Sequence, residues 1–323
     1  MNKLSRDRRT QVVRCLVEGN SIRATVRMTG VAKNTVAKLL VDLGSACSEY
    51  QNEVMRELPC QRVQADEIWA YCYSKQKNVP EEHKDTFGYG DVWTWTAIDA
   101  DTKLVPCWLV GERTYEDAAT FISDLADRLA SRVQLTTDGF HPYLYAVQDA
   151  FGGDIDYAML RKIYGADPKA DKTKYSPAKC IGVETQIKSG RPDWQHISTS
   201  YVERQNLTMR MGMRRFTRLT NAFSKKVENL AAAVSLHFMY YNFARKHQTL
   251  KGQTPAMAAG IADHVWSVEE IIGLLEASES GVGSGCSGKS KSKAKSKAKI
   301  GIEGGNQSRR APAGPLKWVR GPF

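Results

Sequence analysis

The spacing of the apolar residues changes at residue 62, from a helical period to the alternation that is typical of strands. Helical spacing returns over 115–129 and 143–151. The predicted strands occupy 62–73, 91–99, 103–111 and 132–137, with a further strand over 154–163. This order predicts an α/β domain over residues 62–277, built as a mixed sheet flanked by helices.

The first 45 residues predict a separate all-α unit of three short helices. A helical apolar stripe ends at Gly19, Ser21 is placed to cap a second helix, and Gly30 supplies a tight turn. The third helix is expected over about 34–43. Two short helices hinged on one glycine are the helix-turn-helix pattern, whose second helix enters the major groove of DNA. A plain three-helix bundle used for protein contacts is the alternative.

The outward positions of the predicted recognition helix carry polar side chains that suit DNA. Lysines contact phosphates, and asparagine and threonine side chains can read base edges. We therefore expect DNA contacts from Lys33, Asn34, Thr35 and Lys38.

The positive charge is concentrated at both ends of the chain. The net charge of +11 divides into +6 over residues 1–44, +8 over 278–323 and −3 between them. Basic ends around a near-neutral middle are typical of a protein that binds a polyanion, while simple solubilisation explains the tail about as well. Lysines alternate through the tail from Lys289 to Lys299 and cannot bury a core, so we expect 278–323 to be disordered.

The remaining segments complete the predicted organisation. Residues 46–61 are expected to form a helical connector, and 166–195 lack periodicity and predict an inserted loop. Helices are expected over about 200–215 and 220–246.

The cysteines and the hydropathy exclude several classes of protein. The seven cysteines form no Cys-x-x-Cys pair, which argues against a zinc finger and a disulfide framework. No stretch approaches the roughly 18 apolar residues of a membrane span, and the first residues contain no apolar signal core. We expect a cytoplasmic, nucleoid-associated protein with no membrane partner and no nucleotide cofactor.

Three acidic residues lie in settings that a phosphoryl-transfer enzyme would need. Asp66 lies inside the first predicted strand, Asp138 closes the strand over 132–137, and Glu203 opens a helix. Each has an ordinary explanation: a surface strand residue, an Asp-Gly turn and a Ser200-x-x-Glu203 capping box. Oxygen-only ligands of this kind suit Mg²⁺ or Mn²⁺, and two such ions can activate an attacking oxygen and stabilise a leaving one.

The context of these carboxylates favours a shared site. Asp138-Gly139 leads from a strand into a helix, and Asp66 shares a strand face with Ile68, where an unpaired carboxylate is costly. Glu67 and Asp99 are alternative metal ligands, which we rank below Asp66, Asp138 and Glu203. The helix that begins near Glu203 also carries cations that could approach DNA phosphate, at Arg204, Arg210, Arg214 and Arg215.

Three short motifs carry a resemblance to a known family. Gln64-Ala-Asp-Glu-Ile-Trp69, Thr136-Thr-Asp-Gly139 and Ser200-Tyr-Val-Glu-Arg-Gln-Asn206 resemble the acidic motifs of bacterial DDE transposases, and are most similar to the insertion-sequence-1 family. The likeness spans about 62–260 and includes Asn242-Phe-Ala-Arg-Lys-His247 and Thr254-Pro255.

The resemblance implies an RNase H-like fold and a Mg²⁺-dependent transposase with Asp66, Asp138 and Glu203 as metal-binding catalytic residues and Arg210 as their basic partner. The expected partners are the terminal inverted repeats of an insertion sequence and target DNA, bound by a homodimer or a larger assembly. Two alternatives stay open. One is an RNase H-like nuclease or resolvase that cuts without joining, and the other is a non-catalytic helix-turn-helix regulator.

Overall fold

The computed structural model describes residues 3–165, 179–217 and 221–281. The Lys-rich run of the predicted tail and residues 166–178 of the predicted insertion lie outside these ranges. None of the helices in the described ranges combines the length and apolar character that a membrane crossing requires.

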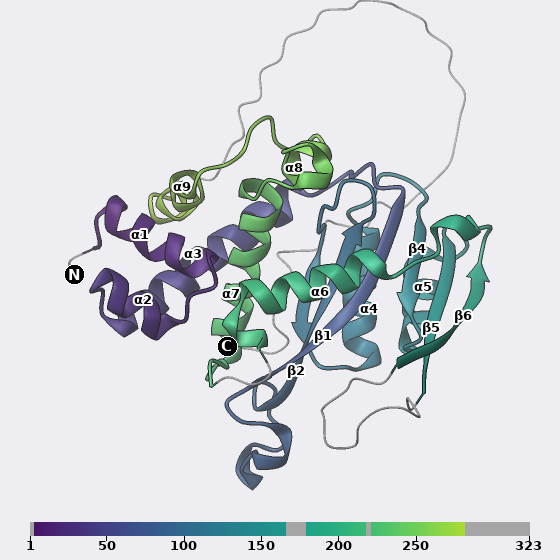
Figure 1. The fold of residues 1–323 in the computed structure, drawn as a ribbon, viewed down its shortest axis with the longest axis horizontal. Coiled ribbons are helices and arrows are strands. Elements are labelled where there is room, and N and C mark those ends of the chain that lie inside the picture. Colours follow the sequence, from purple (N-terminus) through teal and green to yellow (C-terminus); the bar gives the residue numbers. More distant parts are fainter. Residues whose placement is uncertain (1–2, 166–178, 218–220, 282–323) are drawn as a thin grey trace, which may run out of the picture.

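A six-stranded mixed sheet forms the centre of the molecule, in the order β3-β2-β1-β4-β5-β6 (Figure 1). β4 runs parallel to both β1 and β5, and the other three pairings are antiparallel. The strands are β1 (Arg62–Cys72), β2 (Gly90–Asp99), β3 (Trp108–Gly111), β4 (Gln134–Asp138), β5 (Asp156–Gly165) and β6 (Lys179–Ser189). The mixed sheet predicted from the sequence is confirmed, and it is compatible with an RNase H-like fold.

Two strand predictions need correction. The strand expected over 103–111 forms only at β3, where the register pairs Trp93 with Gly111. The loop expected over 166–195 contains β6, so that part of the prediction was wrong. β6 pairs with β5 alone, and Ile181 and Val183 on it are exposed. A strand that buries so little carries a weak apolar signal in its sequence.

Helices cover both faces of the sheet (Figure 1). On one face Trp95 of β2 packs with Phe121 of α4 (Tyr115–Ala126) and Tyr143 of α5 (Pro142–Phe151). On the other face Ile68 of β1 lies in one core cluster with Val202 of α6 (Ser200–Gly212) and with α7 (Val227–Met239). The strand alternation read from the sequence corresponds to these two buried faces.

Three helices precede the sheet, as expected: α1 (Arg6–Val17), α2 (Ile22–Thr29) and α3 (Lys33–Val54). Ser21 caps α2 by accepting from the Ala24 amide, and Gly30 turns the chain with φ of 68°, a left-handed conformation that suits glycine. These features match the sequence prediction for the second helix and its turn.

The third helix is longer than predicted, because the segment 46–61 begins as a continuation of α3. Its second half packs on α7 so closely that a Cβ on Gly44 would lie 2.6 Å from Ala232 Cα. Ser235 Oγ also donates to the Gly44 carbonyl at 2.7 Å. Tertiary packing against α7 therefore extends this helix beyond the predicted end at about residue 43.

The C-terminal part of the described chain returns to the N-terminal helices. After α7 come a π-helical turn (Tyr240–Ala244), α8 (Pro255–Ala258) and α9 (Val268–Glu279). Ion pairs join α1 to α9, with Arg9 Nη2 at 3.3 Å from Glu279 Oε1 and Arg14 Nη2 at 2.7 Å from Glu269 Oε1. The basic side chains of α1 are thus partly matched by acidic ones of α9.

Candidate metal centre and active site

The carboxylates of Asp66, Glu67 and Asp138 meet at the end of β4. The parallel register aligns Ala65 of β1 with Thr137 of β4. The residues that follow them are Asp66 in β1 and Asp138 in β4. One oxygen from each of the three carboxylates lies within 4.8 Å of the others. Successive strand residues point to opposite faces, and Asp66 and Glu67 therefore reach the end of β4 from its two sides.

Burial and mutual repulsion make these carboxylates unusual. Burial, followed by the charges of Glu67, Asp138 and Glu203, raises the pKa of Asp66 to about 8. Burial also raises the pKa of Glu67 and of Asp138 above their ordinary values. Like charges held this close in a low dielectric disfavour ionisation unless a cation joins them.

Arg113 is a cation that contacts two members of the cluster. It follows β3, and its Nε donates to Glu67 Oε1 at 2.5 Å, while its Nη2 lies 3.8 Å from Asp138 Oδ2. Tyr143 of α5 donates to the second oxygen of Glu67 at 3.2 Å. The guanidinium of Arg113 also lies over the ring of Phe140, 4.0 Å from the centroid. One arginine therefore offsets part of the negative charge and fixes Glu67.

Gln64 attaches α6 to β1 beside the cluster. Its side chain is buried, and its Oε1 accepts from the backbone amides of Tyr201 at 2.8 Å and Val202 at 3.2 Å. Two of the amides that a helix start leaves unsatisfied are thereby paired from the sheet. Further along α6, Asn206 Nδ2 donates to Asp66 Oδ2 at 2.8 Å.

Glu203 lies between these two attachment points, one helical turn into α6. Its charge contributes to the raised pKa values of Asp66 and Asp138, which places it near the cluster. Its carboxylate nevertheless lies outside the set of oxygens within 4.8 Å, and it pairs with Lys162 of β5. Thr199 Oγ1 also donates to Glu203 Oε1, at 2.6 Å. Thr199 occupies the N-cap position without a side-chain cap hydrogen bond, and Ser200 already lies within the helix. The capping box that was the ordinary explanation of Glu203 therefore does not form.

The two rival ligands have different outcomes. Asp99 accepts hydrogen bonds from the amide and the hydroxyl of Thr102, at 2.8 and 2.6 Å. It therefore stabilises a turn, which is why it was ranked below the three predicted ligands. Glu67 was also ranked below the three predicted ligands, yet its carboxylate lies in the cluster with Asp66 and Asp138. Nothing in the sequence around Glu67 indicated that its side chain would join the cluster.

The donor set of the cluster fits a hard divalent cation. All three groups offer carboxylate oxygens, the ligand type that Mg²⁺ and Mn²⁺ prefer. The raised pKa values give a second indication, because a bound cation relieves the repulsion that causes them. Asp66, Glu67 and Asp138 would hold such an ion, with Glu203 next to them.

The predicted DNA-binding side chains form two groups, neither of which joins the cluster. Lys33, Asn34, Thr35 and Lys38 are exposed at the start of α3, where Lys38 also pairs with Asp42 at 2.6 Å. On or after α6, Arg204 and Arg214 are exposed, whereas Arg210 and Arg215 are partly buried. A cleft of about 870 Å³ lies between the two groups, and Lys33, Asn34, Arg214 and Arg215 all line it.

Sequence reasoning missed four residues of the site: Gln64, Arg113, Tyr143 and Asn206. Gln64 and Asn206 stand two residues before Asp66 and three after Glu203, so strand and helix periodicity place them on the same faces as those acids. Arg113 and Tyr143 reach Glu67 from distant segments, and nothing in their local sequence indicates it.

No protein-family model matches the chain, and neither does any curated protein. Among solved structures, it is similar to a piggyBac transposase in a cryo-EM synaptic complex with hairpin DNA. The TM-score is 0.36 and the identity 10%, over 86% of this chain and 71% of that chain. A TM-score this low carries no argument about fold or activity, so the function is argued from the site.

Proposed function

We propose that the chain is a divalent-metal-dependent DNA transposase with an RNase H-like catalytic domain, which cleaves DNA strands and transfers them. The observation that carries the proposal is the convergence of three carboxylates at the end of β4, next to a helix that carries arginines. A cluster of acids with cations nearby suits a phosphodiester substrate, because the metal is bound by the acids and the phosphates by the cations.

Each side chain has a proposed role. Asp66, Asp138 and Glu203 are the proposed catalytic carboxylates, and Glu67 shares the cluster with the first two. When bound, Mg²⁺ or Mn²⁺ supplies Lewis-acid stabilisation of the charge that develops at the phosphate. Arg204 and Arg210 of α6 hold backbone phosphates of the substrate. No covalent protein intermediate is required, so no serine or tyrosine nucleophile is proposed.

The three N-terminal helices are proposed as the part that recognises the ends of the element. The exposure of Lys33, Asn34 and Thr35 at the start of α3 supports this role. A complex that joins two DNA ends needs at least two catalytic chains, so we propose a dimer or a larger assembly.

The test is cleavage of labelled duplexes that carry the DNA flanking this gene, with Mg²⁺ or Mn²⁺. We expect cleavage by the native protein and none above background by Asp66→Asn or Asp138→Asn. Asp85→Asn is the matched control, because Asp85 is an exposed carboxylate outside the cluster. Full cleavage by either cluster variant would contradict the proposed catalytic site.

The products separate the proposed function from the alternatives. A transposase joins the released 3′ end to a second DNA, whereas a nuclease or resolvase of the same fold gives cut ends alone. A regulator binds the duplexes and cuts none of them, with or without metal.

A further inference from the structure

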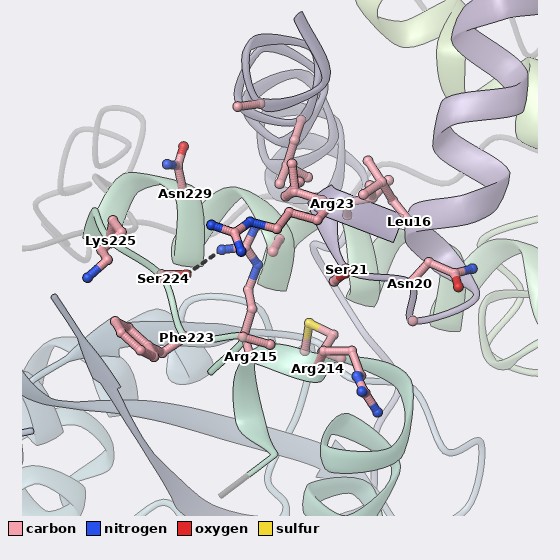
Figure 2. Close-up of a pocket in the computed structure, with 18 of the residues that line it drawn as sticks. Leu16, Asn20, Ser21, Arg23, Arg214, Arg215, Phe223, Ser224, Lys225 and Asn229 are labelled. Atoms are coloured by element: carbon pink, nitrogen blue, oxygen red, sulfur yellow. Dashed lines mark hydrogen bonds between the residues drawn. The ribbon is translucent and has the colours of Figure 1, made fainter. Parts of the chain in front are cut away.

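The cleft of about 870 Å³ lies between the N-terminal helices and the segment that joins α6 to α7 (Figure 2). One wall is formed by the turn between α1 and α2 and by the start of α3. The other is formed by residues 212–215 and 221–226 and by Asn229, Ala233, Leu236 and His237 of α7. The two walls are far apart in the sequence. The cleft is therefore a product of the tertiary fold.

The charge of this cleft is of one sign. The residues that line it in the described part of the chain include no aspartate or glutamate. They include six cations: Arg23, Lys33, Arg214, Arg215, Lys225 and Lys226. Six positive charges around one cleft without a lining carboxylate favour a polyanion.

Arg23 and Arg215 bring positive charge into the cleft from its two walls. Their side chains extend toward each other from the two walls in Figure 2. Arg215 donates to the buried Ser224 hydroxyl, and burial lowers its pKa to about 10. A phosphate between two guanidinium groups that face one cleft would be contacted by both.

The size of the cleft limits what it can hold. Its volume lies within the range of about 300–1,000 Å³ that is typical of small-molecule sites. A short run of a single strand fits this volume.

A row of aromatic rings leads from the cleft toward the carboxylate cluster. Phe223 lines the cleft, and its ring centroid lies 4.8 Å from that of Tyr71 on β1. Tyr71 in turn lies 5.7 Å from Trp69, which has the same strand face as Glu67. All three rings are half-buried, which leaves part of each accessible. The four residue steps from Tyr71 to Glu67 span about 13 Å of strand.

Cations accompany the aromatic row. Lys225 Nζ lies 4.6 Å from the Phe223 centroid, and Arg113 Cζ lies 5.0 Å from the ring of Trp93. Trp93 is the cross-strand neighbour of Trp69. Alternating rings and cations are what proteins use to bind single-stranded nucleic acid, with bases stacked on the rings and phosphates next to the cations.

We propose that this cleft and the row Phe223-Tyr71-Trp69 bind a single strand of DNA and guide it to the carboxylate cluster. The choice of DNA rests on the proposed function. The phosphates lie among the cleft cations, and unpaired bases stack on the rings. The strand that reaches the metal centre is thus separated from its partner before it is cut or joined.

The test is fluorescence anisotropy of the full chain with a short labelled single strand and with the matching duplex, in EDTA to prevent cleavage. We expect the substitutions below to weaken binding of the single strand more than binding of the duplex, which the N-terminal helices are also proposed to bind. Arg23→Gln/Lys226→Gln should weaken single-strand binding about tenfold or more at low salt and reduce the slope of log Kd against log salt by about 0.7 per lost contact. The matched control is Lys75→Gln/Lys77→Gln, which removes the same charge from exposed lysines outside the cleft.

The aromatic row is tested separately. Phe223→Leu keeps an apolar side chain but removes the ring, and we expect about fivefold to hundredfold weaker binding, the equivalent of one lost base stack. Phe223→Tyr keeps the ring and should bind within about twofold of the native protein. Thermal melting of each variant identifies any that has lost its fold.

Two results would overturn this proposal: an equal loss of single-strand and duplex binding in Arg23→Gln/Lys226→Gln and Phe223→Leu, or equal single-strand affinity of Arg23→Gln/Lys226→Gln and its lysine control. Neither result affects the cleavage test of the carboxylates. Conversely, cleavage by Asp66→Asn would contradict the proposed active site and would not affect the proposal that the cleft binds a single strand.

Discussion

Asn206 of α6 donates a hydrogen bond to Asp66 of β1, with 2.8 Å between Nδ2 and Oδ2. Asn206 is buried, and the carboxyl it contacts has a pKa raised to about 8 by burial and by Glu67, Asp138 and Glu203. An amide N–H stabilises the ionised form of a carboxyl, which is the form that binds a cation. Asn206 is therefore a positioning residue that ties α6 to the proposed metal centre.

Asn206→Ala should weaken metal binding. Loss of a hydrogen bond to a metal-binding side chain typically costs about 10- to 100-fold in metal affinity or activity. We expect a loss of this size in a Mn²⁺ titration followed by calorimetry, and a parallel loss of cleavage. Asn78→Ala, at an exposed asparagine away from the cluster, is the control. Native Mn²⁺ affinity in Asn206→Ala would contradict the role.

Gln64→Ala should destabilise the attachment of α6 to the sheet. The substitution removes the acceptor of the Tyr201 and Val202 amides. An unsatisfied buried donor costs about 1–3 kcal/mol, so the free energy of unfolding in urea should fall by about that amount. Gln195→Ala, at an exposed side chain, should leave it unchanged. A Gln64→Ala protein as stable as the native one would show that water replaces the acceptor.

Much of the fold could be predicted because a buried face imposes a period on the sequence. β1 and β2 are buried along most of their length, and the sequence identified both. The edge strand β6 buries little on either face, and its sequence predicted a loop. The full length of α3 depends on the contact of Gly44 with Ala232, which no local pattern in α3 indicates.

The candidate site could be predicted in part for a similar reason. Asp66 and Asp138 stand at places that strand periodicity identifies, and the parallel register of β1 and β4 brings them together. That register is a property of the folded sheet, and so is the approach of Arg113 to Glu67. The sequence therefore predicted two members of the cluster and ranked the third too low.

Glu67→Gln and Glu203→Gln should differ in metal binding without DNA. Glu67 lies in the cluster with its side chain 1% exposed, whereas Glu203 pairs with Lys162 and Thr199. We expect Glu67→Gln to weaken Mg²⁺ binding about tenfold or more, and Glu203→Gln to weaken it less. Both should lower cleavage, since Glu203 is proposed to act once the substrate is bound.

Calorimetric titration with Mg²⁺ measures the difference, and Glu81→Gln, at an exposed glutamate, is the control. A larger loss of Mg²⁺ affinity in Glu203→Gln would assign the third ligand to Glu203.

His237 should make the fold sensitive to acid. Burial, and then the charge of Arg245, lowers its pKa from 6.5 to about 3. The unfolded chain binds a proton near pH 6.5 and the folded chain does not, so stability is complete above that pH and falls from there toward pH 3. The maximum slope from one such group is about 1.4 kcal/mol per pH unit.

His237→Phe should therefore flatten the decline of the unfolding free energy between pH 6.5 and 4.5, measured in urea. His141→Phe, at an exposed histidine, should not. Equal declines in the native protein and His237→Phe would show that His237 is already protonated in the folded state.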